Sequence, residues 1–94
     1  MNIRKLVARR RELDANLVAF ARRPWTADSE VILSASGGGR DAKDAADPAY
    51  EYFLELFVIE EAFGDALSGL PADRQVDAVI HYAENDAYPD WLDL

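Results

Sequence analysis

The chain has 94 residues, half of them apolar, with no cysteine and a formal net charge of −8. This length predicts one domain over residues 1–94 with a single modest core, and the apolar content excludes a disordered chain. The absence of cysteine excludes disulfides, thiolate metal sites and cysteine nucleophiles, and no apolar stretch is long enough for a membrane span.

The charge is divided by position along the chain. Residues 1–23 carry seven cations and two carboxylates, a net charge of +5. Residues 24–94 carry three cations and sixteen carboxylates, a net charge of −13. An acidic surface attracts cationic partners and repels nucleic acid and anionic lipid. We therefore expect a protein partner, no nucleic acid and no membrane, and the charged start after Met1 favours a cytoplasmic location.

The first predicted element is a helix over residues 3–23. Apolar residues recur there at three- and four-residue spacing, Asn2 suits the N-cap, and Pro24 ends the pattern. The basic residues of this helix have two interpretations. Either they bind nucleic acid or a membrane surface, or they pair with the protein's own acids, which is the interpretation we favour.

A β-branched run over residues 30–34 predicts one short strand. Its backbone groups need a pairing partner, which we expect in residues 24–28, in residues 35–46 or in another molecule. Three glycines at 37–39 lack the Gly-Lys-Ser/Thr and the helix start of a phosphate-binding loop. They therefore predict a mobile surface loop.

Two further helices are predicted over residues 49–67 and 71–85, each with a proline in the favoured first turn. Residues 52–58 suit a strand equally well by β-propensity. We favour a helix there because the pattern continues without a break into residues 60–63. The predicted fold class is α+β and predominantly helical, with three main helices and a short strand or small hairpin.

The residues that carry catalysis or metal binding in other proteins are scarce. His81 is the only histidine, which excludes a multi-histidine metal site within one chain. The sequence contains no Ser/His/Asp arrangement, no Asp-x-Asp-x-Asp-Gly loop and no internal repeat. We predict no enzyme activity, no cofactor and no metal site.

Residues 78–88 read Ala-Val-Ile-His-Tyr-Ala-Glu-Asn-Asp-Ala-Tyr and resemble the A-x-x-Y-Y-x-E-N-D-A-F ending of a group of small bacterial proteins. Members of that group resemble immunity proteins of contact-dependent growth inhibition and related toxin systems. The layout of residues 28–90 is similar too, whereas residues 1–23 have no counterpart. His81 stands where the group has the first aromatic of its Tyr-Tyr pair, and Tyr88 stands in place of Phe.

The resemblance implies a protein that binds and neutralises a cognate toxin domain. Many such toxins cleave nucleic acids and are basic, so an acidic inhibitor gains from electrostatic steering. Two alternatives remain: a phage-type inhibitor that mimics nucleic-acid charge, and a small regulatory or assembly subunit. We expect a monomer or a weak homodimer.

The predicted interface is the C-terminal tail, where two aromatic anchors lie among carboxylates. The alternative is that both aromatics fold back to cap the core. Residues 51–61, with Glu55, Glu60 and Glu61, are the second choice of interface. The predicted partner-binding residues are Glu84, Asp86, Tyr88, Asp90, Trp91 and Asp93.

Overall fold

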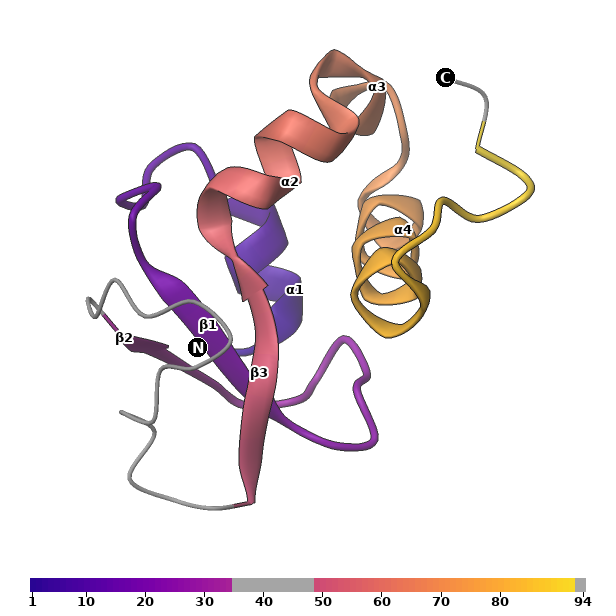
Figure 1. Ribbon diagram of the computed structural model, residues 1–94. Coiled ribbons are helices and arrows are strands. Elements are labelled where there is room, and N and C mark those ends of the chain that lie inside the picture. Colours follow the sequence, from indigo (N-terminus) through magenta and orange to yellow (C-terminus); the bar gives the residue numbers. More distant parts are fainter. Residues whose placement is uncertain (35–48, 93–94) are drawn as a thin grey trace.

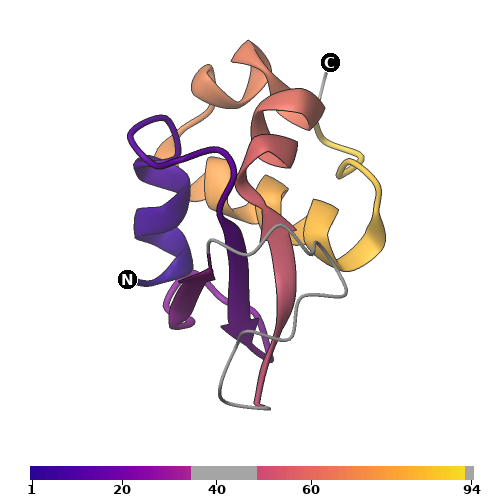
Figure 2. The ribbon, with the colours of Figure 1, turned by 60° about the vertical axis from the view of Figure 1, so that its left-hand side comes forward.

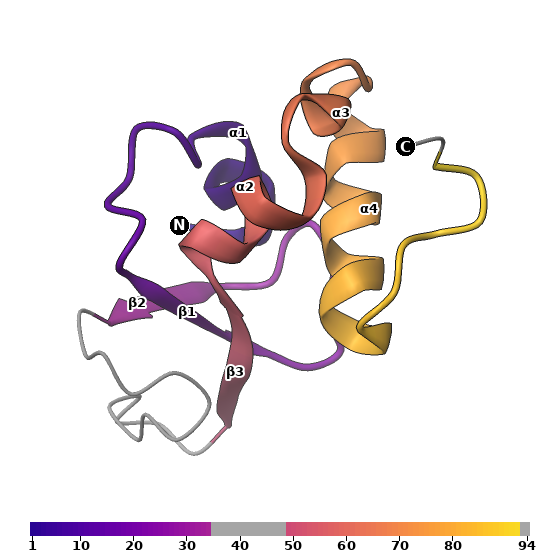
Figure 3. The same ribbon diagram turned by 45° about the horizontal axis from the view of Figure 1, so that its top comes forward.

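A computed structural model describes residues 1–34 and 49–92 of the chain. Within these residues the three strands form one antiparallel sheet, with β1 (Val18–Arg22) between β2 (Val31–Ser34) and β3 (Tyr50–Glu55) (Figure 2). The helices of the same residues are α1 (Ile3–Ala8), α2 (Leu56–Phe63), α3 (Asp65–Ser68) and α4 (Ala72–Asn85). α1 and α4 pack against each other on one side of the sheet, and α2 continues directly from β3 (Figures 1 and 3).

The predicted helix over residues 3–23 is wrong beyond its first turns. α1 begins at Ile3 with Asn2 as its N-cap, as expected, but it ends at Ala8. The chain then turns at Asp14, whose side chain accepts from the Asn16 N–H over 2.9 Å. β1 follows, and its first four residues are all buried. Because a central strand buried on both faces is continuously apolar, its sequence also satisfies the three- and four-residue spacing of a helix.

The predicted helix over residues 49–67 is wrong in its first third. β3 occupies that part of the chain and pairs with β1, so the strand alternative for residues 52–58 holds as far as Glu55. The strand passes into α2 without a loop. Gly64, at a φ of 53°, then separates α2 from α3. Glycine adopts this backbone conformation without the strain that a side chain would introduce.

The expectation of a predominantly helical fold is therefore wrong. Helices hold 41% and strands 22% of the described residues, and only α2 and α4 of their helices exceed seven residues. The helix predicted at 71–85 is confirmed as α4, and the strand predicted at 30–34 is confirmed as β2. No helix in this part of the chain is long and apolar enough to cross a membrane.

The partner of β2 is β1, which was not among the predicted partners. Residues 24–28 instead form the connection between these two strands. The predicted glycine loop at 37–39, and residues 35–46 as a pairing partner, lie outside the described residues.

The core lies between the sheet and the helices. Trp25, in the connection between β1 and β2, packs edge-on against Phe53 of β3 with the ring centroids 4.9 Å apart. The indole N–H of Trp25 donates to the Ala21 carbonyl over 3.2 Å, so the ring is held in one place. The largest fully buried side chains are Phe53, Ile3, Leu6, Ile59, Leu67, Val7 and Val79.

Candidate protein-binding surface on α4

The arginines near the N-terminus are engaged by the protein's own groups. Arg4 pairs with Asp28 at 2.8 Å, and Arg23 pairs with Glu51 at 2.9 Å. These pairs are half-exposed, so each contributes little to stability, but together they cancel much of the basic charge. The predicted pairing with internal acids is confirmed. The ion pairs of this group include Arg4–Asp28, Arg9–Glu12, Arg10–Glu60, Arg11–Glu60, Arg11–Asp65 and Arg23–Glu51.

Arg10 is the buried member of this group, with a side chain only 7% exposed. It follows α1 and ties it to the other helices, because its guanidinium donates to the Val7 carbonyl, to the Ser68 hydroxyl and to the Gln75 side chain. Burial lowers the pKa of Arg10 from its ordinary value. Its Nε lies 3.6 Å from Glu60 Oε1, within ion-pair distance but too far for a hydrogen bond.

Glu60 of α2 is the acid on which two of the arginines converge. Arg11 donates to Glu60 Oε1 over 2.9 Å, and this charge-assisted hydrogen bond lowers the pKa of Glu60. The same bond raises the pKa of Arg11, which also reaches Asp65 at 3.4 Å. Glu60 is therefore occupied by internal cations.

The carboxylates of α4 are in a different position. Asp73, Asp77 and Glu84 are exposed and are spaced by four and seven residues, so they lie along one face of the helix. None of the three forms an ion pair within residues 1–34 and 49–92. We call these three residues the acidic face of α4. Its charge is available to a partner.

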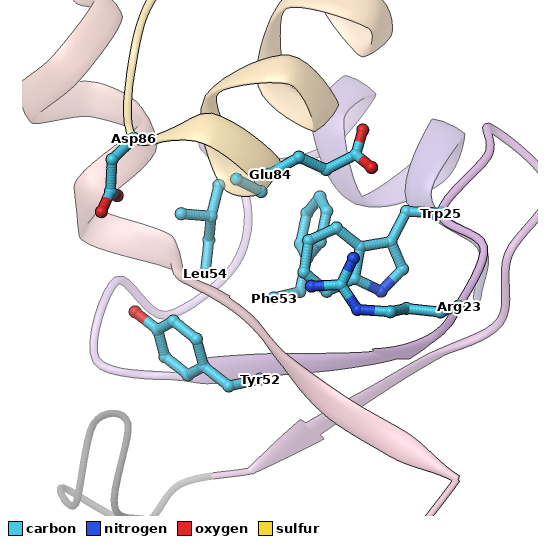
Figure 4. A pocket seen from close by; sticks show the side chains of 8 residues that line it. Arg23, Trp25, Tyr52, Phe53, Leu54, Glu84 and Asp86 are labelled. Carbon is cyan, nitrogen blue, oxygen red and sulfur yellow. The ribbon is translucent and has the colours of Figure 1, made fainter.

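A first cavity, of about 300 Å³, opens where the C-terminal end of α4 approaches the sheet. Glu84 and Asp86 reach its rim from the end of α4, while Tyr52 lines it from β3 and Arg23 from the residue that follows β1 (Figure 4). Asp86 is the C-cap of α4 and adopts the left-handed conformation, with a φ of 52°. The cavity is thus bordered by both acidic and basic groups.

The guanidinium carbon of Arg23 lies over the indole of Trp25 at this cavity, 3.9 Å from the ring centroid (Figure 4). This distance allows a cation–π interaction, which attracts a cation to the negative face of the ring. The ion pair with Glu51 holds Arg23 in place. The protein therefore already places a guanidinium on this aromatic surface.

A second cavity, of about 400 Å³, lies along α4. Its wall on one side is Trp25 and the two residues that follow, and on the other side it is formed by α4, including Asp77, His81 and Glu84. Trp25 and Glu84 line both cavities. The two cavities therefore adjoin at Trp25 and Glu84 beside the acidic face, and we call them together the groove.

The predicted tail anchors behave differently from each other. Tyr88 donates its hydroxyl hydrogen to the Ala62 carbonyl, and its ring packs edge-on against Phe63 at 5.4 Å. It therefore attaches the tail to α2, as the capping alternative proposed. Both residues are exposed to a similar extent, Tyr88 to 39% and Trp91 to 44%, but the ring of Trp91 contacts the Arg74 guanidinium, which lies 4.7 Å from its centroid.

The predicted acidic residues are only partly brought together. Glu84 and Asp86 meet at the first cavity, and Asp90 is exposed in the tail. The tail runs back along α4 on the side away from the sheet (Figures 1 and 3). Asp93 lies outside the described residues.

Residues 51–61, the second choice of interface, offer less available charge. Glu60 is engaged by arginines, Glu51 pairs with Arg23, and Glu55 accepts from the Tyr52 hydroxyl over 3.2 Å. Glu61 is exposed and forms no ion pair within the described residues. The acidic face of α4 is therefore the better candidate surface.

Two residues of the groove were missed by the sequence analysis. Trp25 was not among the predicted site residues, although a tryptophan directly after Pro24 is a large aromatic at a chain turn. Asp77 was passed over, although it stands four residues after Asp73 and seven before Glu84. That spacing would have been enough to find the acidic face.

Within the described residues, no group of three or more histidine and carboxylate side chains is arranged to hold a metal ion. Comparison of the chain with protein-family models, curated proteins and solved structures finds no match.

Proposed function

We propose that this protein is an immunity protein that binds and neutralises a cognate toxin domain. The observation that carries the proposal is the acidic face of α4, whose carboxylates lie beside a groove with an aromatic wall and have no ion-pair partner in the described residues. The likeness of residues 78–88 to the ending of immunity-type proteins supports the same function.

The charge distribution favours a basic partner. The N-terminal arginines are largely engaged by internal acids. By contrast, residues 71–92 carry five carboxylates and a single arginine. A basic surface, such as the substrate-binding face of a nuclease-type toxin, is steered toward such a region and approaches it faster than a neutral one.

The size of the surface is adequate for a protein partner. A typical stable interface buries roughly 800 Å² on each side, and the accessible surface of the whole chain is 5447 Å². The acidic face, the groove and the exposed Trp91 together provide polar and aromatic contacts on and around one helix. Such a combination suits an inhibitor that covers the functional surface of its toxin.

The rest of the proposal follows from this role. The protein acts as a monomer or weak homodimer in the cytoplasm and needs no cofactor, because it works by binding rather than by catalysis. The absence of cysteine suits a reducing compartment. Its acidic surface disfavours nucleic acid and anionic membranes as partners.

The experiment is affinity capture from the native cell with the wild-type chain and with an Asp73→Asn, Asp77→Asn, Glu84→Gln variant. We expect the wild-type chain to retain a basic protein that the variant loses. The captured protein, produced alone in a host cell, should arrest growth, and co-production of the wild-type chain should restore it.

A matched control carries Glu12→Gln, Asp14→Asn and Glu61→Gln, which remove the same charge from other exposed positions. The control should bind and protect like the wild type. Capture of an acidic or harmless protein, or equal losses in the control and the acidic-face variant, would contradict the proposal.

A further inference from the structure

We propose that the second cavity is a subsite for one arginine side chain of the partner. This inference deepens the proposed function and rests on it for the nature of the partner, a basic protein. The subsite itself is defined by Trp25, Asp77, His81 and Glu84, which lie around the cavity between α4 and the connection from β1 to β2.

The dimensions suit a side chain. A cavity of about 400 Å³ is at the small end of the range for ligand pockets in proteins. It is bordered by one helix and one chain segment, which leaves it open for insertion from outside. A folded element of a partner is too large for it, whereas a single extended side chain fits.

The lining matches the two parts of an arginine. Ile80 and the small exposed part of Trp25, 7% of that residue, provide an apolar wall for the aliphatic stem. Asp77 and Glu84 stand at the same cavity and accept hydrogen bonds from the guanidinium N–H groups. Arginine exploits a flat aromatic surface and paired carboxylates better than lysine does, because its charge lies in a plane with five donors.

The adjoining cavity provides an independent observation. There, Arg23 of the chain itself lies 3.9 Å from the centroid of the same indole and is held by a carboxylate, Glu51. The protein therefore already pairs one arginine with this indole and a carboxylate, which are the kinds of group that line the second cavity. Glu84 lines both cavities yet forms no ion pair within the described residues, so the internal Arg23 does not satisfy it.

The test uses a short arginine peptide, acetyl-Gly-Arg-Gly-amide, with its citrulline counterpart as an uncharged match. The chain carries Trp91→Phe, so that Trp25 is its only tryptophan. We expect saturable quenching of Trp25 fluorescence by the arginine peptide. Because citrulline lacks the charge, its peptide should bind at least about tenfold more weakly.

Matched variants locate the site. Asp77→Asn and Glu84→Gln should each weaken binding of the arginine peptide about fivefold, as expected for loss of one partly exposed charge pair. Asp73→Asn removes the same charge from the same helix but lies outside both cavities, so its effect should be below about twofold. Equal effects at all three positions, or equal binding of the two peptides, would overturn the subsite.

The two proposals fail in different ways. If the arginine peptide binds as expected but no toxin is captured, the subsite stands and the immunity function falls. If a toxin is captured through the acidic face while Trp25 fluorescence does not respond to the arginine peptide, the function stands and the subsite falls. Thermal unfolding of every variant checks that the fold is intact.

Discussion

Glu60 accepts a hydrogen bond from Arg11 over 2.9 Å, which joins α2 to the turn that follows α1. The basic start of the chain and its acidic remainder thus meet in ion pairs at the surface of the fold, and much of the division of charge seen in the sequence is cancelled locally. Three of the carboxylates that form no ion pair within the described residues make up the acidic face of α4.

The first prediction concerns acid stability. The pKa of Glu60 is lower in the folded protein than in the unfolded chain, chiefly because of the Arg11 hydrogen bond. The contribution of the Glu60 carboxylate to the free energy of unfolding is therefore complete above the ordinary glutamate pKa of about 4.3. This contribution is lost as the pH falls through the lower pKa that Glu60 has in the folded protein. Glu60→Gln should lower the free energy of unfolding at pH 7 by about 0.5 kcal/mol. At pH 3 the free energies of unfolding of the variant and the wild type should differ by less than this.

Urea unfolding at both pH values measures this prediction. The neighbouring Glu61→Gln is the control, because Glu61 is exposed and forms no ion pair within the described residues. Its effect should be small at both values. A Glu60→Gln difference that is as large at pH 3 as at pH 7 would contradict the linkage.

The second prediction concerns Arg10. Arg10→Met should lower the free energy of unfolding by about 2 kcal/mol, because the Gln75 side chain, the Ser68 hydroxyl and the Val7 carbonyl lose a shared donor. Arg9 is half-exposed and forms only a weak ion pair with Glu12, at 3.7 Å. Arg9→Met should therefore change the free energy of unfolding by less than about 0.5 kcal/mol. Equal effects in urea unfolding would show that Arg10 does not join the helices.

The third prediction separates the two tail aromatics. Tyr88→Phe removes the hydrogen bond to the Ala62 carbonyl and should lower stability by about 1 kcal/mol, without changing affinity for the partner. Trp91→Ala should instead speed dissociation of the partner, at a loss of about 2 kcal/mol or more in binding, if Trp91 is an anchor. Melting and binding kinetics on both variants test this. A large stability loss with unchanged kinetics for Trp91→Ala would place that residue in the core instead.

The fourth prediction concerns the tail carboxylates. Replacing Asp86, Asp90 and Asp93 together by Asn should mainly slow association with the partner and reduce its salt dependence, since exposed charges act on encounter more than on residence. Asn tolerates the left-handed backbone of Asp86, so the end of α4 is preserved. Stopped-flow association at two salt concentrations measures the effect. A wild-type rate would remove the tail from the interface and leave the acidic face alone.

The local sequence was sufficient to predict a helix or strand where recognisable residues mark its ends. The helix at 71–85 has a proline at its start and is interrupted at Asp86, and it was predicted. The strand at 30–34 is a short run of β-branched residues, and it was predicted as well. The cap of α1 at Asn2 was also readable, because capping depends on neighbours in the chain.

Local rules failed where a strand had the apolar content of a helix. Residues 18–21 are buried on both faces, and nothing in their own sequence states that β2 and β3 lie beside them. Asp14 and Asn16 do indicate a turn at this place, because both residue types favour turns. At residues 50–55 the strand runs into α2 without any break, so continuity of pattern was misleading there.

The candidate site could be predicted only in part, for a related reason. Glu84 and Asp86 follow from the acidic end of α4, but the groove needs Trp25, which comes from a connection nearly sixty residues earlier. A contact between residues so far apart in the sequence is determined by the order of the strands in the sheet and not by spacing along the chain. The division of roles between Tyr88 and Trp91 likewise depends on contacts with α2 and Arg74.

The central strand of the sheet is also the first to be synthesised. β1 leaves the ribosome before either of its neighbours, and β3 completes the sheet only after residue 55 has followed. α4, which bears the acidic face, is translated later still. Because these pairings are distant in sequence, we expect the nascent chain to fold in one late step, with no binding-competent fragment released early. Under the proposed function, a truncated translation product would give a cell no protection.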